Sequence, residues 1–191
     1  MAVKTMAKNT GTGQYNVGWH ELTISKAVDG KWTDRQGKVK RIIDINFENY
    51  PDNMHHRVFE SSNKTTGEEF KIANLFRFAC AGIINVLQDP TGKNPVIQYD
   101  DEAANLVGTR INVLFVKEPS KTDGKEYSKS FDLVPVAQET EHLTWTDDDV
   151  AHLKKNVEKQ YAKRTATPTN GVGTVNLDTT TTVTGDAEIP F

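Results

Sequence analysis

The chain has 191 residues and a formal net charge of −3, from 23 basic and 26 acidic side chains. Its single cysteine, Cys80, cannot form an internal disulfide, which excludes a disulfide-stapled secreted scaffold. The first residues lack an apolar core, and no stretch approaches the ~18 apolar residues of a membrane span. We therefore expect that the chain has neither a signal peptide nor a membrane anchor. We expect a cytoplasmic location.

The acidic excess belongs to the end of the chain. Residues 165–191 contain no Lys or Arg and three acidic residues, so residues 1–164 carry 23 basic and 23 acidic side chains. The same stretch is rich in Thr, with Gly, Asn and Pro between, and almost nothing in it is large and apolar. Such a segment cannot offset its conformational entropy by burial, so we expect residues 165–191 to form a disordered tail.

The sequence pattern of the first part of the chain predicts β-strands. Residues 1–14 are polar and rich in Gly and Thr, which indicates a flexible arm. Alternating apolar and polar residues then predict three strands, with turns at Asp29-Gly30 and at residues 50–53. Three strands joined by turns indicate an antiparallel meander; the predicted strands cover residues 20–28, 39–48 and 54–60.

The period then changes to that of a helix. Apolar residues at helical spacing predict a helix over residues 68–87, which contains Cys80 and ends at Asp89-Pro90. A short helical turn over 100–107, capped by Asp100, precedes two strands at 109–117 and 125–136. These two strands form a second hairpin, joined by a turn at residues 121–124.

A last helix follows the strands. Thr146 is a good helix cap, and the three Asp residues after it suit the positive end of the helix dipole. We expect this helix to reach Arg164 and to pack through a narrow apolar stripe on the barrel or on another subunit. The stripe consists of Val150, Leu153, Val157 and Tyr161.

Three strands, a helix and two strands is the element order of an OB-fold, although other α+β folds share it. We therefore predict a mainly β (α+β) protein: a five-stranded OB-fold barrel with a helix between strands 3 and 4, plus a C-terminal helix and a disordered tail. The barrel domain would cover residues 15–140, the C-terminal helix 141–164 and the tail 165–191.

The connection between the first two strands, residues 29–40, concentrates positive charge around one aromatic side chain, Trp32. Bases stack on such rings, and Lys and Arg neutralise phosphates. In an OB-fold, this loop and strands 2–3 line the usual oligonucleotide site. The alternative is a solvated loop whose Trp32 folds back onto the barrel. The basic residues at this site are Lys31, Arg35, Lys38, Lys40 and Arg41.

The third strand adds to this candidate site. If Val58 points inward, then His55, Arg57 and Phe59 point outward beside Lys40. An outward aromatic ring next to a guanidinium suits base stacking beside a phosphate contact. The alternative is that a helix or the N-terminal arm covers Phe59.

The last hairpin is a weaker extension of the groove. Tyr127 and Lys129 would lie along it, but nearby acidic residues nearly cancel its lysines.

No catalytic constellation is visible in the sequence. His55 and His56 are adjacent on a strand, so their side chains diverge, and the remaining histidines have no ligand spacing. The run Asp147–Asp149 is explained by a helix N-terminus; a metal-dependent nuclease built on it is the least favoured alternative. We expect no enzyme activity, no cofactor and no metal.

The sequence ends in Asp186-Ala187-Glu188-Ile189-Pro190-Phe191. Two acidic residues are followed there by two bulky apolar residues, Ile189 and Phe191. An apolar pocket with a basic rim would hold such a segment. This ending resembles the acidic, Ile-Pro-Phe-terminated tip of bacterial single-stranded DNA-binding proteins. The resemblance implies that replication, recombination and repair enzymes are recruited through Asp186, Glu188, Ile189, Pro190 and Phe191.

The body is similar to phage-encoded single-stranded DNA-binding proteins, through GWHELTISKA in its first strand and FKIANLFRFACAGI in its central helix. The resemblance implies sequence-independent binding that protects single-stranded DNA in phage replication, recombination and repair, in the cytoplasm of the bacterial host. The alternative is a protein-interaction adaptor of a recombination system without intrinsic DNA binding. The sequence leaves oligomeric state, cooperativity and DNA-versus-RNA preference open. The predicted DNA contacts are Lys31, Trp32, Arg35, Lys38, Lys40, Arg41, Arg57, Phe59, Tyr127 and Lys129.

Overall fold

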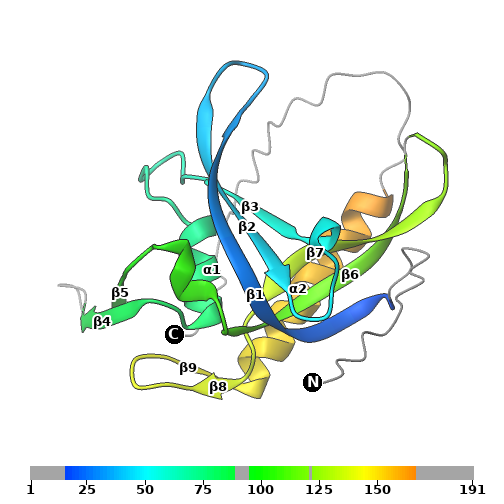
Figure 1. Cartoon of the computed structure of the whole chain (residues 1–191). Coiled ribbons are helices and arrows are strands. Elements are labelled where there is room, and N and C mark those ends of the chain that lie inside the picture. The colour runs from blue at the N-terminus through cyan, green and yellow to red at the C-terminus, as the bar shows by residue number, and fades with distance from the viewer. Residues whose placement is uncertain (1–15, 89–94, 121, 167–191) are drawn as a thin grey trace, which may run out of the picture.

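A five-stranded antiparallel sheet forms the centre of the computed structural model, which describes residues 16–88, 95–120 and 122–166 (Figure 1). The strand order is β3-β2-β1-β6-β7. The strands are β1 (Gly18–Thr33), β2 (Val39–Phe47), β3 (His56–Phe59), β6 (Arg110–Pro119) and β7 (Glu126–Val134). The long β1 pairs with β6 through its first part and with β2 through its second, so it joins the two halves of the sheet.

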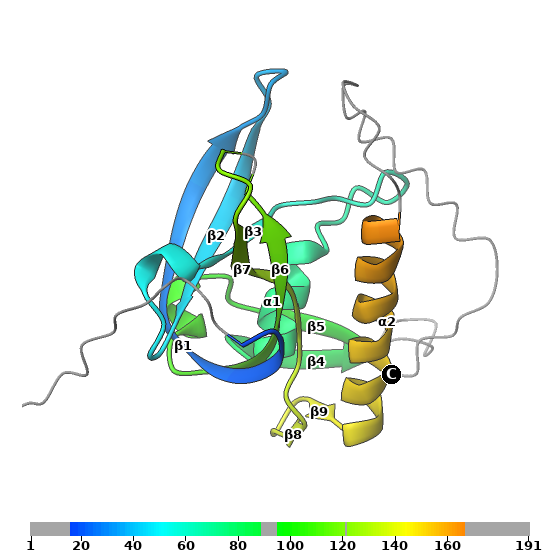
Figure 2. The ribbon, with the colours of Figure 1, turned by 90° about the vertical axis from the view of Figure 1, so that its right-hand side faces the viewer.

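The two described helices pack in two different apolar clusters, and α2 lies along the outside of the molecule (Figure 2). The helix α1 (Lys71–Ala79) packs its buried face, including Phe76, against the main core, which also contains Ile43, Phe47 and Phe115. The helix α2 (Asp147–Ala166) packs on the other side of β6 and β7 around a second apolar cluster. We call the side of the sheet that faces α1 inward and the opposite side outward.

An irregularity between Ile24 and Lys26 lets β1 serve both halves. Before it, even-numbered residues such as Leu22 face the inward core, whereas after it the odd-numbered Ala27 does. One extra residue shifts the two-residue alternation of side chains by one position. As a result Trp19, before the bulge, and Trp32, after it, both lie on the outward side of the sheet.

The prediction of a mainly β chain with a C-terminal helix is confirmed, but closure into a barrel is not. Strands β3 and β7 are the two edges of the sheet, and no ladder joins them in the described part of the chain. They do approach each other, because the hydroxyl of Ser130 donates to the carbonyl oxygen of His55 at 3.4 Å.

The predicted helix over 68–87 is wrong beyond Ala79. Cys80 ends α1 in the left-handed conformation, with φ 50°, instead of lying within the helix. At Gly82, with φ 63°, a Cβ would lie 2.3 Å from the carbonyl oxygen of Asp100, so this position requires glycine. Residues 83–88 then form β4 (Ile83–Gln88), which pairs with β5 (Pro95–Tyr99). The apolar residues from Ile83 onwards fit a strand as well as a helix, so their spacing led to a predicted helix that is too long.

The predicted turn at Asp29-Gly30 is also wrong. Strand β1 continues through these residues, and the chain reverses only after Thr33. There the Asp34 carboxylate accepts hydrogen bonds from the backbone of Gln36 and Lys38, at 2.9 and 2.8 Å. The connection between the first two strands is therefore a long two-stranded ribbon with a short turn. The third strand is shorter than predicted, because a 3₁₀ turn, η1 (Asp52–Met54), occupies its start.

The predicted second helix is confirmed, including its cap. The Thr146 hydroxyl accepts the Asp149 backbone N–H at 3.2 Å, while the Asp149 carboxylate accepts that of Thr146 at 3.0 Å. The apolar stripe of α2 packs on the sheet of its own chain, which decides between the two predicted partners. Within the described ranges, no helix combines the length and apolarity needed to cross a membrane.

Smaller elements complete the structure. The predicted short helical turn is present as η2 (Ala103–Leu106), with Glu102 instead of Asp100 at its start. A two-residue hairpin, β8 (Gln138–Glu139) and β9 (Thr144–Trp145), leads into α2. Residues 165 and 166, predicted to begin the tail, are the last of α2. The predicted arm 1–14, Lys121 of the predicted turn and the predicted tail from residue 167 lie outside the described residues.

Candidate nucleic-acid interface

The outward face of β1, β2 and β3 carries an apolar cluster that no described helix covers. The rings of Trp32 and Phe59 meet edge to face, with centroids 5.3 Å apart and planes at 81°. Ile42 is the register partner of both Gly30 and Phe59 and lies on the same outward face. Trp32 is 37% exposed, whereas Ile42 is buried. We call Trp32, Ile42 and Phe59 the aromatic platform.

Gly30 makes this arrangement possible. A Cβ at this position would lie 3.2 Å from Cγ1 and 3.4 Å from Cδ1 of Ile42, tighter than ordinary packing. Because the glycine has no side chain, Ile42 occupies the space over the β1 backbone. The platform therefore combines two aromatic rings with a buried aliphatic side chain.

Cationic side chains border the platform. Lys40 stands directly opposite Trp32 in the register of β1 and β2. Arg57 shares the outward face and donates to both oxygens of Asp44, each at 2.7 Å. Hydrogen bonding to Arg57 lowers the pKa of Asp44, so this pair stays charged and holds the guanidinium in one orientation.

The turn beyond the platform adds further positive charge. Arg35 and Lys38 lie exposed in the turn. Lys31 lies exposed in β1 just before it, but it is the register partner of Arg41 and therefore faces the side opposite the platform. Figures 1 and 2 show this ribbon projecting beyond the rest of the molecule. Trp32 and Lys40 form the last pair but one of the ladder, so the aromatic platform lies next to the basic turn of the ribbon.

Arg41 does not join the platform. Its side chain lies on the opposite face, where its Nε donates to both carboxylate oxygens of Asp29 at 3.0 Å and its other nitrogens bind Asp101. The hydrogen bond from Arg41 lowers the pKa of Asp29, and the pKa of Arg41 is raised in return. Arg41 therefore ties the ribbon to the segment before η2, instead of pointing outward beside Lys40.

The second hairpin carries the remaining predicted contacts. The Tyr127 hydroxyl donates to Asp123 at 2.6 Å, a bond that lowers the pKa of Asp123 and raises that of Tyr127. The ammonium of Lys129 lies 3.3 Å from Glu118, which also approaches Arg164 of α2 at 3.7 Å. The hairpin β6–β7 extends toward the same end of the molecule as the β1–β2 ribbon (Figure 1), but the charge of Lys129 is paired with that of Glu118.

Sequence reasoning missed Ile42. The signal was present, because Ile42 and Ile43 are adjacent in a strand and must face opposite sides. One of the two had to be an apolar residue on the outward face. Ile43 took the core position, and Ile42 completes the platform.

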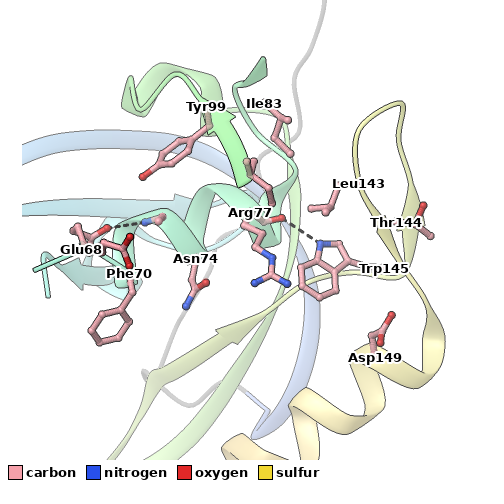
Figure 3. A pocket seen from close by; sticks show the side chains of 13 residues that line it. Glu68, Phe70, Asn74, Arg77, Ile83, Tyr99, Leu143, Thr144, Trp145 and Asp149 are labelled. Atoms are coloured by element: carbon pink, nitrogen blue, oxygen red, sulfur yellow. Dashed lines mark hydrogen bonds between the residues drawn. The ribbon is translucent and has the colours of Figure 1, made fainter. Parts of the chain in front are cut away.

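A second concave site, a cleft of about 410 Å³, lies between α1, β4–β5 and β8–β9 (Figure 3). The Arg77 guanidinium lies 4.9 Å from the centre of the Trp145 ring, whose indole N–H donates to the Arg77 carbonyl at 3.2 Å. Burial lowers the pKa of Arg77. Three carboxylates, from Glu68, Glu69 and Asp149, line the same cleft. This excess of acidic groups suits a neutral or basic ligand better than a phosphate.

The described residues form neither a metal site nor a reactive thiol site. In the part of the chain that the structure describes, no three His, Cys, Asp or Glu side chains are placed to hold a metal ion. Burial raises the pKa of the Cys80 thiol, which disfavours the reactive thiolate.

Comparison with protein-family models gives no match for this chain, and comparison with curated proteins gives none either.

Proposed function

We propose that this chain is a sequence-independent single-stranded DNA-binding protein of phage type, which protects single-stranded DNA during replication, recombination or repair. The observation that carries the proposal is the aromatic platform on the only outward part of the described sheet that no described helix covers, next to a basic ribbon. Exposed aromatic rings beside cations are the features that bind unpaired bases and the phosphates between them.

The architecture supports an OB-fold as the scaffold. The sheet order β3-β2-β1-β6-β7, a bent first strand shared by both halves, and a helix after β3 agree with that fold. The approach of Ser130 to His55 brings the two edge strands close, as in a partly open barrel. In this scaffold the platform occupies strands 2 and 3 and the hairpin before them, where OB-folds bind oligonucleotides.

Each side chain has a distinct role in the proposed complex. Trp32 and Phe59 stack on bases, and Ile42 forms the floor between them. Lys40, with Lys38 and Arg35 of the turn, neutralises phosphates. Arg57 contacts the DNA strand while its guanidinium is held in place by Asp44. Arg41 positions the ribbon and does not contact DNA. Tyr127 and Lys129 contribute less, because both are engaged within their hairpin.

Recruitment of partner enzymes is the second part of the proposal. It rests on the sequence Asp186 to Phe191, where acidic residues precede Ile-Pro-Phe. Deleting residues 167–191 is expected to abolish recruitment and to leave DNA binding intact or tighter. A truncated protein that lost DNA binding would contradict this division of roles.

The test is a titration of the full chain with oligo-dT, monitored by tryptophan fluorescence. Quenching is expected to saturate at micromolar protein or below, and the affinity is expected to fall steeply as salt is raised. Trp19→Phe is the matched control, because Trp19 lies outward on the same strand but is bonded to Glu158 of α2. An unchanged signal, or binding indifferent to salt, would refute the proposal.

The cleft beside Arg77 favours a second candidate function, an adaptor that binds a protein segment. Its mixed aromatic and acidic lining suits a basic or neutral peptide. An adaptor would retain a peptide partner in pull-down experiments and would show no binding to oligo-dT. Asn74→Trp, which fills the cleft, would abolish the adaptor's interaction and leave oligo-dT binding unchanged.

A further inference from the structure

The hairpin formed by β4 and β5 stands apart from the rest of the sheet. In the described part of the chain these two strands pair with each other and with no other strand. Figure 1 shows them projecting from the body on the side away from β6 and β7. An isolated two-stranded hairpin is marginally stable in water, so it gains from packing against something else.

The two faces of this hairpin differ. One face turns toward the body, where Ile83, Ile97 and Tyr99 line the cleft beside Arg77. On the opposite face Leu87 and Val96 form a cross-strand pair, 41% and 48% exposed. Ile84, the extra residue of a β-bulge, is 64% exposed. We call Ile84, Leu87 and Val96 the aliphatic patch.

Charge is absent from these two strands. No residue of β4 or β5 is charged, whereas Lys, Arg, Asp and Glu make up 26% of the chain. Edge strands of soluble monomers are usually protected by charged side chains, particularly Lys. Here that protection is missing from strands that present three aliphatic side chains to solvent.

We infer that the aliphatic patch is a self-association surface, and that its occupant is the same patch of a second copy of this chain. A two-fold axis brings identical surfaces together, so the patch must be complementary to itself. An uncharged aliphatic surface meets this condition, whereas a charged one would repel its own copy. Nucleic acid is a poor occupant, because neither strand offers a cation.

The size of the patch sets the strength of this association. Three aliphatic side chains on each partner bury less than the ~1,200 Å² typical of stable interfaces, so the dimer is weak. A dissociation constant in the range of about 10–100 μM is expected. The dimer leaves the aromatic platform free, because the platform lies on other strands.

The test is sedimentation velocity on the full chain up to roughly 200 μM, above the expected dissociation constant. The wild type is expected to shift from monomer to dimer, and both Leu87→Lys and Val96→Glu are expected to remain monomeric. Circular dichroism verifies that each variant is folded.

Val107→Lys is the matched control, since Val107 is also 48% exposed but follows η2. It is expected to dimerise like the wild type. A wild type that stays monomeric over the whole range would overturn the inference. So would a dimer that survives Leu87→Lys, or one that Val107→Lys abolishes. DNA binding by Leu87→Lys is measured separately, so this outcome is independent of the proposed function.

Discussion

The two halves of the sheet use their outward faces differently. Over β6, β7 and the start of β1, α2 covers the outward face, and Leu114, Val116 and Val134 are buried beneath it. Over β2, β3 and the end of β1, the outward face carries the aromatic platform and has no described helix above it. Two tryptophans of one strand show the contrast: Trp19 is bonded to α2, and Trp32 is exposed beside Phe59.

This difference shows that the role of an outward aromatic residue in this fold depends on whether a helix covers it. Beneath α2 it contributes to stability, because the helix removes it from water. On the uncovered half the same residue type remains accessible to a ligand. Mutations in the covered half should therefore change stability and leave DNA binding intact, and mutations in the uncovered half should do the reverse.

The largest effect is expected from Leu114→Ala in the covered half. Leu114 is 7% exposed between the sheet and α2, so truncation leaves a cavity that costs about 2–4 kcal/mol. Urea unfolding measures this loss, and oligo-dT binding should persist wherever the variant is folded. Val28→Ala is the control from the uncovered half: Val28 is 44% exposed, and its loss should cost less than about 0.5 kcal/mol. Equal costs would remove the distinction between the halves.

Trp32→Ala is expected to give the next largest effect, on binding. Loss of one stacking ring should weaken oligo-dT binding by about 1–3 kcal/mol, roughly 5- to 150-fold. The free energy of unfolding should change little, because Trp32 is already 37% exposed. Isothermal titration with the full chain measures the affinity without a tryptophan signal. A variant that binds as tightly as wild type would remove the platform from the site.

Acid should destabilise the protein partly through His56, on the inward side of the uncovered half. Burial lowers the pKa of His56 to about 4, with the neighbouring His55, Lys71 and Lys129 adding to the effect and Asp44 opposing it. The unfolded chain then binds a proton near pH 6.5 that the folded chain takes up only near pH 4. Stability from this group is complete above pH 6.5 and is lost as the pH falls toward 4.

The thermal midpoint at pH 7 and pH 5 tests this linkage. Wild type is expected to lose about 2 kcal/mol more than His56→Gln over this interval, a shift of several degrees. Gln keeps a polar side chain of similar size and does not titrate. If both proteins lost the same stability, the acid sensitivity would belong to other groups.

The smallest expected effect is that of Lys40→Gln. It should reduce the slope of log affinity against log salt by about 0.7, with only a modest loss of affinity at low salt. Lys129→Gln is the comparison, because Lys129 already pairs with Glu118, and its slope should change less. If the slope changed equally in the two variants, the DNA contact would have to include Lys129 on the covered half.

Some of this site could be predicted from residue types alone. A large aromatic residue among cations at Trp32, and an outward Phe59 beside Arg57, indicate this surface from the sequence. Alternation along β2 already places Arg41 on the face opposite Lys40. Its partner Asp101 could not be predicted, because Asp101 lies 60 residues further along the chain. The alignment of Trp19 with Trp32 depends on a bulge that the alternation of residues does not reveal.

The sequence by itself determined the local elements whose signals are short-range. These are the capped start of α2 at Thr146, the apolar stripe of that helix, the meander of β1 to β3 and the neutral, locally basic body; the structure decided that the stripe packs on the sheet of its own chain. Tertiary structure decided where α1 ends: Cys80 takes the left-handed conformation, and the chain then passes close to Asp100 at Gly82. It also decided which outward half α2 covers and which it leaves open. Such outcomes depend on contacts between distant residues, and a local pattern carries no record of them.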